Sequence, residues 1–297
     1  MMNQSRRKRL RYSRIFGCLL LFLAALALAA WAASGIWRYV HERNLAASVS
    51  GKPVYYLLMG IDGDEPAHAD SIILAAVHEG GKDISIISLP GDTRLGRDDE
   101  VNRPLRDTYL TGGVEETRSA VENLLHIRID HYAVYDYQAF NRFADVFSDT
   151  ELYVEEDMSH YDASGEPDIA LRRGFQNLSA SEALGYLRYK GEKETEIARI
   201  QREQRFLKAF LRDRREKGSF LSWLFTRRAW APADSDLTPG DAAGLAYDLV
   251  DYDEGRIHFL ILPGELQTVQ GKSFWIVNPV EIQKIIGLTL TEVPQEA

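Results

Sequence analysis

The chain has 297 residues, a formal net charge of −9 at pH 7 and a single cysteine. Residues 1–33 contain six basic groups and no acids, so the remainder carries 29 basic against 44 acidic groups, a formal charge of −15. This acidic body excludes a general nucleic-acid binder. Because Cys18 lies in the N-terminal apolar segment, the body contains no disulfide and depends on core burial for its stability.

The N-terminal segment is typical of a membrane anchor. The uncharged run Ile15–Ala33 follows a basic cluster and spans about 30 Å as a helix. Basic residues on its N-terminal side indicate a single-pass protein of the cell membrane, with a cytoplasmic N-terminus and an extracytoplasmic body. We predict a basic tail, a transmembrane helix, a linker and an extracytoplasmic domain, over residues 1–14, 15–37, 38–53 and 54–290.

A cleaved signal peptide is the alternative, because Ala30–Trp31–Ala32 resembles a small-x-small cleavage site. Apolar cores of signal peptides usually have about 7–15 residues. The longer run therefore favours an uncleaved anchor.

Strands and helices are both predicted along the rest of the chain. Apolar runs predict strands over 54–60, 71–77, 83–89, 131–137, 151–155, 256–262 and 273–277. Helical spacing predicts helices over 114–125, 138–147, 179–188, 194–215, 238–250 and 279–286. Ser179 and Glu182 have capping-box spacing at one helix start. The pattern predicts an α/β fold, with α+β as the alternative: one mixed central sheet flanked by helices.

Polar residues follow or open several of these elements. Asp62 follows the first strand, Asp70 opens the second, and the stretch Pro90–Arg94 (PGDTR) follows the third. Arg199 and Arg202 lie three residues apart on the longest predicted helix. Taken singly, each feature is also explained by an ordinary turn or by a solvated basic face.

Taken together, the carboxylates and guanidiniums indicate phosphate chemistry. Carboxylate oxygens suit Mg²⁺ or Mn²⁺, which commonly share phosphate oxygens with a substrate. Arginine binds phosphate through a bidentate fork. The chain has neither a Walker P-loop nor a G-x-S-x-G nucleophile motif, and its single cysteine excludes a cysteine-based zinc site.

Seven segments in order resemble the LytR–CpsA–Psr family of cell-envelope proteins. They are YYLLMGID (55–62), DSIILAAV (70–77), ISIISLPGDTRL (84–95), VNRPLRDTYLTGG (101–113), ENLLHIRIDHYAVYDYQAF (122–140), LSASEALGYLRYK (178–190) and ARIQREQRFLKAF (198–210). The resemblance implies a ligase of cell-wall polymers. It transfers a glycopolymer phosphate from a polyprenyl-pyrophosphate carrier in the membrane to a sugar hydroxyl of peptidoglycan.

The resemblance also implies roles for individual residues. Asp62 and Asp70 match the acids that hold Mg²⁺ or Mn²⁺, and Asp92 and Arg94 lie in the catalytic stretch. The residues expected to bind substrate are His68, Arg188, Lys190, Arg199, Arg202 and Gln204. A carrier tail further requires an apolar pocket near Asp92 and Arg199, lined by the sheet and the helix over 198–211.

Several positions depart from the family pattern: Gly91, His68 and Lys190 stand where the family usually has arginine. Glu196 stands about where an aspartate precedes the helix arginine, and Phe147–Ser148–Asp149 replaces a Gly-Gly pair. Two alternatives therefore remain: a non-catalytic polyprenyl-phosphate-binding protein, and a hydrolase of the polyprenyl-pyrophosphate glycan. Four nearby arginines are candidates to compensate: Arg94, Arg97, Arg103 and Arg106. If none of them does, Gly91→Arg is expected to raise turnover.

Overall fold

The computed structural model describes residues 53–61, 67–78, 83–96, 102–146, 150–161, 164–191, 194–251 and 254–290. The predicted tail, transmembrane helix and most of the linker lie outside these ranges, as does Asp62. None of the helices in these ranges combines the length and the apolar composition that a membrane span requires. The described residues all belong to one compact unit, Gly51–Ala297.

A six-stranded sheet forms the centre of this unit, in the order β11-β6-β1-β2-β3-β12. Its strands are β1 (Val54–Ile61), β2 (Ala69–Val77), β3 (Ile84–Leu89), β6 (His131–Tyr135), β11 (Asp234–Ser235) and β12 (Ile257–Ile261). The pairs β1–β6 and β3–β12 are parallel, whereas β1–β2, β2–β3 and β6–β11 are antiparallel. The predicted mixed sheet is thereby confirmed.

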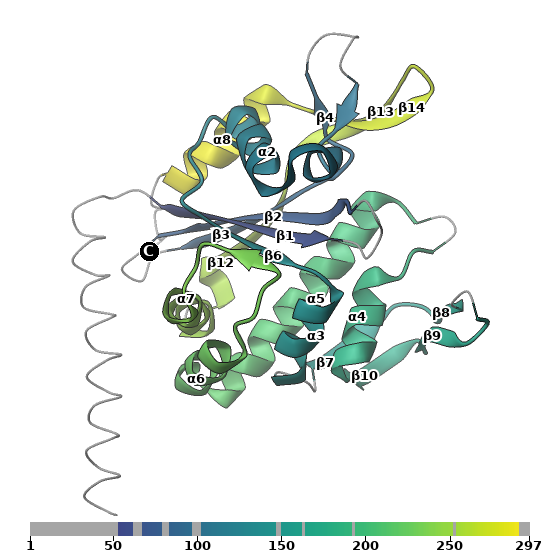
Figure 1. The fold of residues 1–297 in the computed structure, drawn as a ribbon, viewed down its shortest axis with the longest axis vertical. Helices are drawn as coiled ribbons and strands as arrows, with labels where there is room; N and C mark the ends of the chain where they lie inside the picture. The colour runs from purple at the N-terminus through teal and green to yellow at the C-terminus, as the bar shows by residue number, and fades with distance from the viewer. Residues whose placement is uncertain are drawn as a thin grey trace, which may run out of the picture. The chain divides into compact units, whose positions relative to one another are not determined.

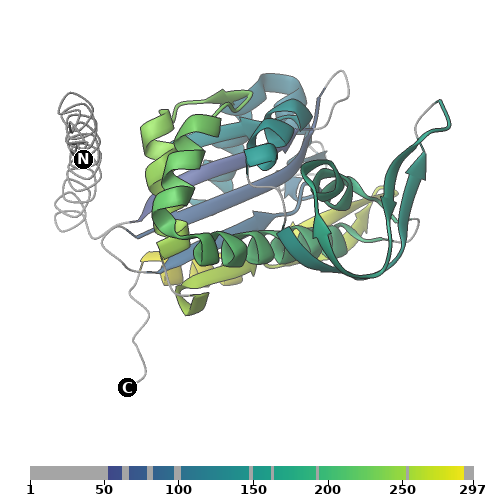
Figure 2. The ribbon, with the colours of Figure 1, turned by 90° about the horizontal axis from the view of Figure 1, so that it is seen from below.

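Helices cover both faces of the sheet (Figure 1). One face packs against α2 (Asp107–Leu125) and α8 (Pro279–Leu290), through Leu57, Met59 and their neighbours. The other packs against α5 (Glu196–Lys217) and α7 (Pro239–Asp251), through Tyr56 and Ile86, and Figure 2 shows this layer in front of the strands. All of β3 is buried because both of its faces are covered.

A smaller β-rich region packs beside α5. It contains β7 (Thr150–Val154) paired with β10 (Gly174–Leu178), and β8 (Met158–Tyr161) paired with β9 (Pro167–Leu171). Helix α4 (Ala180–Arg188) begins with the predicted capping box, in which Ser179 and Glu182 each bond the other's backbone N–H. These elements share a separate hydrophobic cluster with Ala209 of α5. Helix α3 (Tyr137–Val146) lies against α4.

Several elements were not expected from the sequence. They are β4 (Arg94–Leu95), β5 (Arg103–Pro104), α6 (Ser219–Ala229) and β13 (Gly264–Val269), besides β8 to β11. The predicted strand over 273–277 forms as β14 (Lys272–Val277), but it pairs with β13 in a hairpin outside the central sheet.

Helix α2 begins seven residues before its predicted start at Val114. The backbone breaks inside it at Gly112 and at Gly113, whose φ is 61° and ψ −146°. Side chains disfavour that conformation strongly. Because the paired glycines interrupt the helix, helical periodicity in the sequence does not predict its first turn.

We predict that Gly113→Ala destabilises the fold by about 1–3 kcal/mol, measured as the free energy of unfolding in urea. A Cβ at this position meets no atom within 4 Å, so the effect isolates backbone strain. Gly287→Ala is the matched control. Gly287 lies within α8 with equally open space and no unusual φ, so alanine should leave stability unchanged or raise it. Equal effects of the two substitutions would contradict this account.

Candidate active site

Three strand ends meet at one edge of the central sheet. Because β1 and β2 are antiparallel, the end of β1 at Gly60 pairs with Ser71, near the start of β2. The next pair, Ile72 with Leu89, brings the end of β3 alongside. The chain therefore places Asp70 beside the turn that follows β3.

That turn, Pro90–Thr93, is fixed on several sides. Thr93 is fully buried, and both its backbone N–H and its hydroxyl donate to the carbonyl of Pro90, at 3.0 and 2.6 Å. The backbone N–H of Arg106 donates to the carbonyl of Gly91 at 2.9 Å, and that of Trp275 donates to the carbonyl of Asp92 at 2.9 Å. The turn consequently holds Asp92 in a fixed place at the sheet edge.

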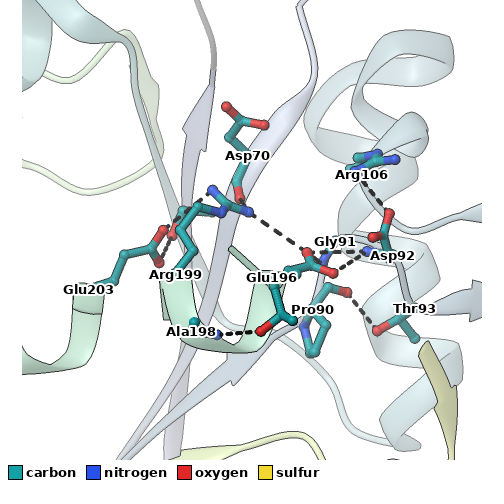
Figure 3. A network of polar contacts seen from close by, with 12 residues as sticks. Asp70, Pro90, Gly91, Asp92, Thr93, Arg106, Glu196, Ala198, Arg199 and Glu203 are labelled. Atoms are coloured by element: carbon teal, nitrogen blue, oxygen red, sulfur yellow. Dashed lines mark hydrogen bonds and ion pairs between the residues drawn. The ribbon is translucent and has the colours of Figure 1, made fainter. Parts of the chain in front are cut away.

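Glu196, in the first turn of α5, binds the same turn from the opposite side (Figure 3). Its carboxylate accepts the backbone N–H of Gly91 at 2.6 Å and that of Asp92 at 3.3 Å. Burial, and secondarily the negative charge of Asp92, raise the pKa of Glu196 to about 7. The resemblance places Glu196 about where the family has an aspartate before the helix arginine, but it does not predict the contact of Glu196 with the turn.

Arg106 supplies a guanidinium at the site. Its Nη1 lies 2.8 Å from Oδ1 of Asp92, and its side chain remains 42% exposed. An added Cβ on Gly91 would lie 3.2 Å from the Cβ of Arg106 and 3.2 Å from Oε1 of Glu196. Glycine at position 91 thus leaves the space in which these two residues approach the turn.

Arg199 is the second guanidinium at the sheet edge. Its Nη2 donates to the backbone carbonyl of Asp70 at 2.7 Å, and its Nη1 lies 3.4 Å from Glu203. Burial raises the pKa of Glu203, which also accepts a hydrogen bond from Ser71 at 3.0 Å. Arg199 is only 12% exposed, so it is held in one orientation.

The site contains more acids than bases. Two guanidiniums, of Arg106 and Arg199, pair with the carboxylates of Asp92, Glu196 and Glu203, and the side chain of Asp70 lies beside them (Figure 3). In Figure 3 the Asp70 carboxylate points away from Arg199, and within the described residues it has no hydrogen-bond or ion-pair partner. A divalent cation suits such a surplus of hard oxygen donors. No group of three or more potential ligands is assembled within the described ranges, which exclude Asp62.

The other predicted substrate-binding residues do not join this network. Arg202 is 2% exposed, ion-paired with Glu194, and donates to the backbone carbonyl of Tyr189. Gln204 donates to Ser88 and to the backbone carbonyl of Leu260, and so connects α5 to β3 and β12.

The remaining predicted residues have other surroundings in the described part of the chain. Arg188 stacks over the ring of Tyr137 at 4.4 Å, and Lys190 is exposed. His68 lies 4.0 Å from Asp107, at the start of α2. Their spacing in the sequence does not show that Arg199 contacts the sheet edge and that these three residues do not.

Arg94 lines a separate feature of the structure. This is a cavity of about 830 Å³ between β4, β5, α2 and α8. Leu95, Leu124 and Ile282 contribute apolar surface, while Arg94 and Arg103 contribute charge. No residue of the helix over 198–211 lines this cavity, so it differs from the pocket expected from the sequence. One of its lining residues, Arg94, nevertheless lies only two positions after Asp92 in the sequence.

At this site arginines and carboxylates meet at the edge of a mixed α/β sheet. The family model LytR_cpsA_psr matches residues 35–289, and the chain belongs to this family.

A curated relative and two solved structures show how far the similarity extends. The polyisoprenyl-teichoic acid–peptidoglycan teichoic acid transferase TagV of Bacillus subtilis is 28% identical over 178 residues, 57% of this chain and 46% of the relative's length. The crystal structure of B. subtilis TagV covers 83% of this chain, and is itself covered completely, with a TM-score of 0.68 and 21% identity. TagT with bound octaprenyl pyrophosphate lipid covers 80% of this chain, and is itself covered to 89%, with a TM-score of 0.60 and 20% identity; TagT is also from B. subtilis.

We predict that the stability difference between the wild type and Glu196→Gln depends on pH. Because the pKa of Glu196 is raised in the folded state, the folded protein binds a proton more tightly than the unfolded chain does. This stabilisation is complete below about pH 4.5 and is lost as the pH rises through about 7. The wild type should therefore lose up to about 3 kcal/mol relative to the glutamine variant across this window.

Urea unfolding at intervals between these pH values measures the effect. Glu281→Gln, at an exposed position on α8, is the control and should show no such trend. A constant difference between the wild type and Glu196→Gln would contradict the buried, raised-pKa description.

Proposed function

We propose that this protein transfers a glycopolymer phosphate from a polyprenyl-pyrophosphate carrier to a sugar hydroxyl of peptidoglycan, outside the membrane. The observation that carries the proposal is the meeting of Asp70, Asp92, Arg106 and Arg199 at one sheet edge in a chain of this family. Relatives support the same class, since TagV is named a teichoic acid transferase and TagT was solved with bound octaprenyl pyrophosphate lipid.

The reaction assigns a role to each group at the sheet edge. The acceptor hydroxyl attacks the phosphorus nearest the polymer, the bond from that phosphorus to the bridging oxygen breaks, and polyprenyl phosphate leaves. Arg106 and Arg199 stabilise the charge on the phosphate oxygens. Asp92 orients Arg106 and accepts the proton of the attacking hydroxyl.

The metal and the carrier tail have separate places in the proposal. Asp70, with Asp62, would hold Mg²⁺ or Mn²⁺, which neutralises pyrophosphate charge when bound. The cavity between α2 and α8 takes part of the isoprenoid tail, because its volume and apolar lining suit such a ligand. Arg94 would then lie between the tail and the phosphates.

The decisive experiment incubates the full chain with a polyprenyl-pyrophosphate glycan, Mg²⁺ and peptidoglycan fragments. We expect polymer joined to the fragments by a phosphodiester, and loss of that product with EDTA. Asp70→Ala should reduce transfer by about 10–100-fold, as expected for removal of a charged ligand. The control Asp157→Ala, at a 61% exposed site in the small β-rich region, should retain activity.

The alternatives give different outcomes in the same assay. Release of the glycan without any acceptor would identify a hydrolase. Binding of the carrier with no product would identify a non-catalytic protein. If Asp70→Ala and the wild type turned over equally, the metal assignment would be wrong.

A second prediction concerns the guanidinium at position 106. Arg106 already approaches Asp92, beside the position where Gly91 replaces the family's usual arginine. Gly91→Arg is therefore expected to lower turnover, not to raise it. We now predict that Gly91→Arg and Arg106→Gly each reduce transfer by about 10–100-fold, since each changes a hydrogen bond to charge worth about 1.5–3 kcal/mol.

The double variant Gly91→Arg, Arg106→Gly moves the guanidinium from one side of the turn to the other. It removes the Cβ that would crowd the new arginine, and should recover part of the activity lost in either single variant. Transfer rate and thermal stability are measured for all four proteins. A double variant no better than the product of the single losses would show that Arg106 does not replace the missing arginine.

A further inference from the structure

Helix α6 has its large apolar side chains on the outside. The two most buried positions carry small polar residues, Ser222 and Thr226, at 3% and 2% exposure. The exposed positions carry large apolar residues, at 39–48% exposure: Phe220, Leu221, Leu224 and Phe225. This is the reverse of the pattern of an ordinary surface helix.

The exposed residues form one continuous stripe. At 3.6 residues per turn, the four apolar side chains and Arg228 fall within an arc of about 140°. The inner side packs against α7, whose buried positions include Ala242, Ala243 and Gly244. Small residues on both helices leave the core no room for the large side chains of α6, which therefore face outward.

Exposed positive charge lies at the C-terminal end of this stripe. Residues 212–228 contain six arginines and lysines and two acids, a formal charge of +4, while the rest of residues 34–297 carries −19. Arg227 and Arg228 lie exposed in the last turn, and Arg227 stacks over Trp223 at 5.5 Å. Asp213 and Arg214 are both buried, and Glu216 is the exposed acid of this stretch. One acid of α7, Asp251, accepts a hydrogen bond from Ser219 at the other end of α6.

The residue after α6 packs into the same hydrophobic cluster as the start of the described domain. Trp230, directly after α6, packs against the same hydrophobic cluster as Val54, the first residue of β1. The 52 residues before Pro53 include the uncharged run Ile15–Ala33. A surface that combines phenylalanine, leucine and tryptophan with arginine at the polar edge matches the boundary between lipid headgroups and acyl chains.

We propose that the exposed face of α6 binds the surface of a bilayer that contains anionic phospholipid. The four apolar side chains enter the headgroup boundary, and Arg227 and Arg228 contact lipid phosphates. This inference goes beyond the transfer reaction and does not depend on it.

The test uses the full chain with Cys18→Ser and one new cysteine, Leu224→Cys, labelled with a nitrobenzoxadiazole fluorophore. The protein is reconstituted into phosphatidylcholine vesicles with or without phosphatidylglycerol, and quenched with lipids brominated near the headgroup end of the acyl chain. Leu266→Cys is the matched control: Leu266 is a 59% exposed leucine on the β13–β14 hairpin, at the opposite side of the ribbon from α6 (Figure 1).

We expect quenching of at least about twofold at position 224, stronger with phosphatidylglycerol, and none at position 266. Adding Arg227→Glu and Arg228→Glu should remove the increment due to phosphatidylglycerol. Absence of quenching at 224, or equal quenching at both positions, would overturn the proposal. So would a blue shift at 224 that needs no lipid and grows with protein concentration, since that indicates a second copy. No turnover is measured, so these outcomes are independent of the transfer reaction.

Discussion

The hydrogen bonds from the backbone of Gly91 and Asp92 to the carboxylate of Glu196 determine where the rest of the site lies. They join the first turn of α5 to the end of β3. Arg199 follows one helical turn later, and its guanidinium consequently reaches the backbone of Asp70. The cost of this arrangement is a buried carboxylate, whose pKa of about 7 reflects desolvation that the two N–H donors and Arg199 only partly offset. Without that contact, α5 would have no charged link to the turn that carries Asp92.

Gly91 and Arg106 are best understood as one feature. A side chain at position 91 would meet both the Cβ of Arg106 and the carboxylate of Glu196 at 3.2 Å. Glycine leaves that space open, Arg106 enters it, and its guanidinium contacts Asp92 from the start of α2. The backbone bond from Arg106 to Gly91 keeps the two positions together whatever side chains they carry. Arg106 thus supplies the positive charge at the sheet edge, and Gly91, 15 positions earlier in the sequence, leaves the space for it.

The central sheet and the helix caps were predictable because their signals are local. The apolar runs of β1, β2 and β3 and the capping box at Ser179 each follow from adjacent residues. Helix α6 was missed because its pattern is reversed, with serine and threonine inside. The roles of Arg199 and Arg202 were not separable either. They share a helix face in sequence, yet one reaches Asp70 and the other is enclosed by Glu194 and two tyrosine rings. Only tertiary packing determines which arginine is available.

The net negative charge of the body opposes binding to an anionic membrane, but the effect of each charge depends on its distance from the lipid. A body with a formal charge of −15 is repelled by an anionic membrane as a whole. At physiological ionic strength, however, the screening length is about 8 Å, so lipid phosphates respond mainly to the charges nearest to them. Arg227 and Arg228 reverse the sign locally, at the C-terminal end of the outward apolar stripe of α6. Repulsion elsewhere on the domain then disfavours other orientations, so the acidic surface and the basic helix select the same face for contact with lipid.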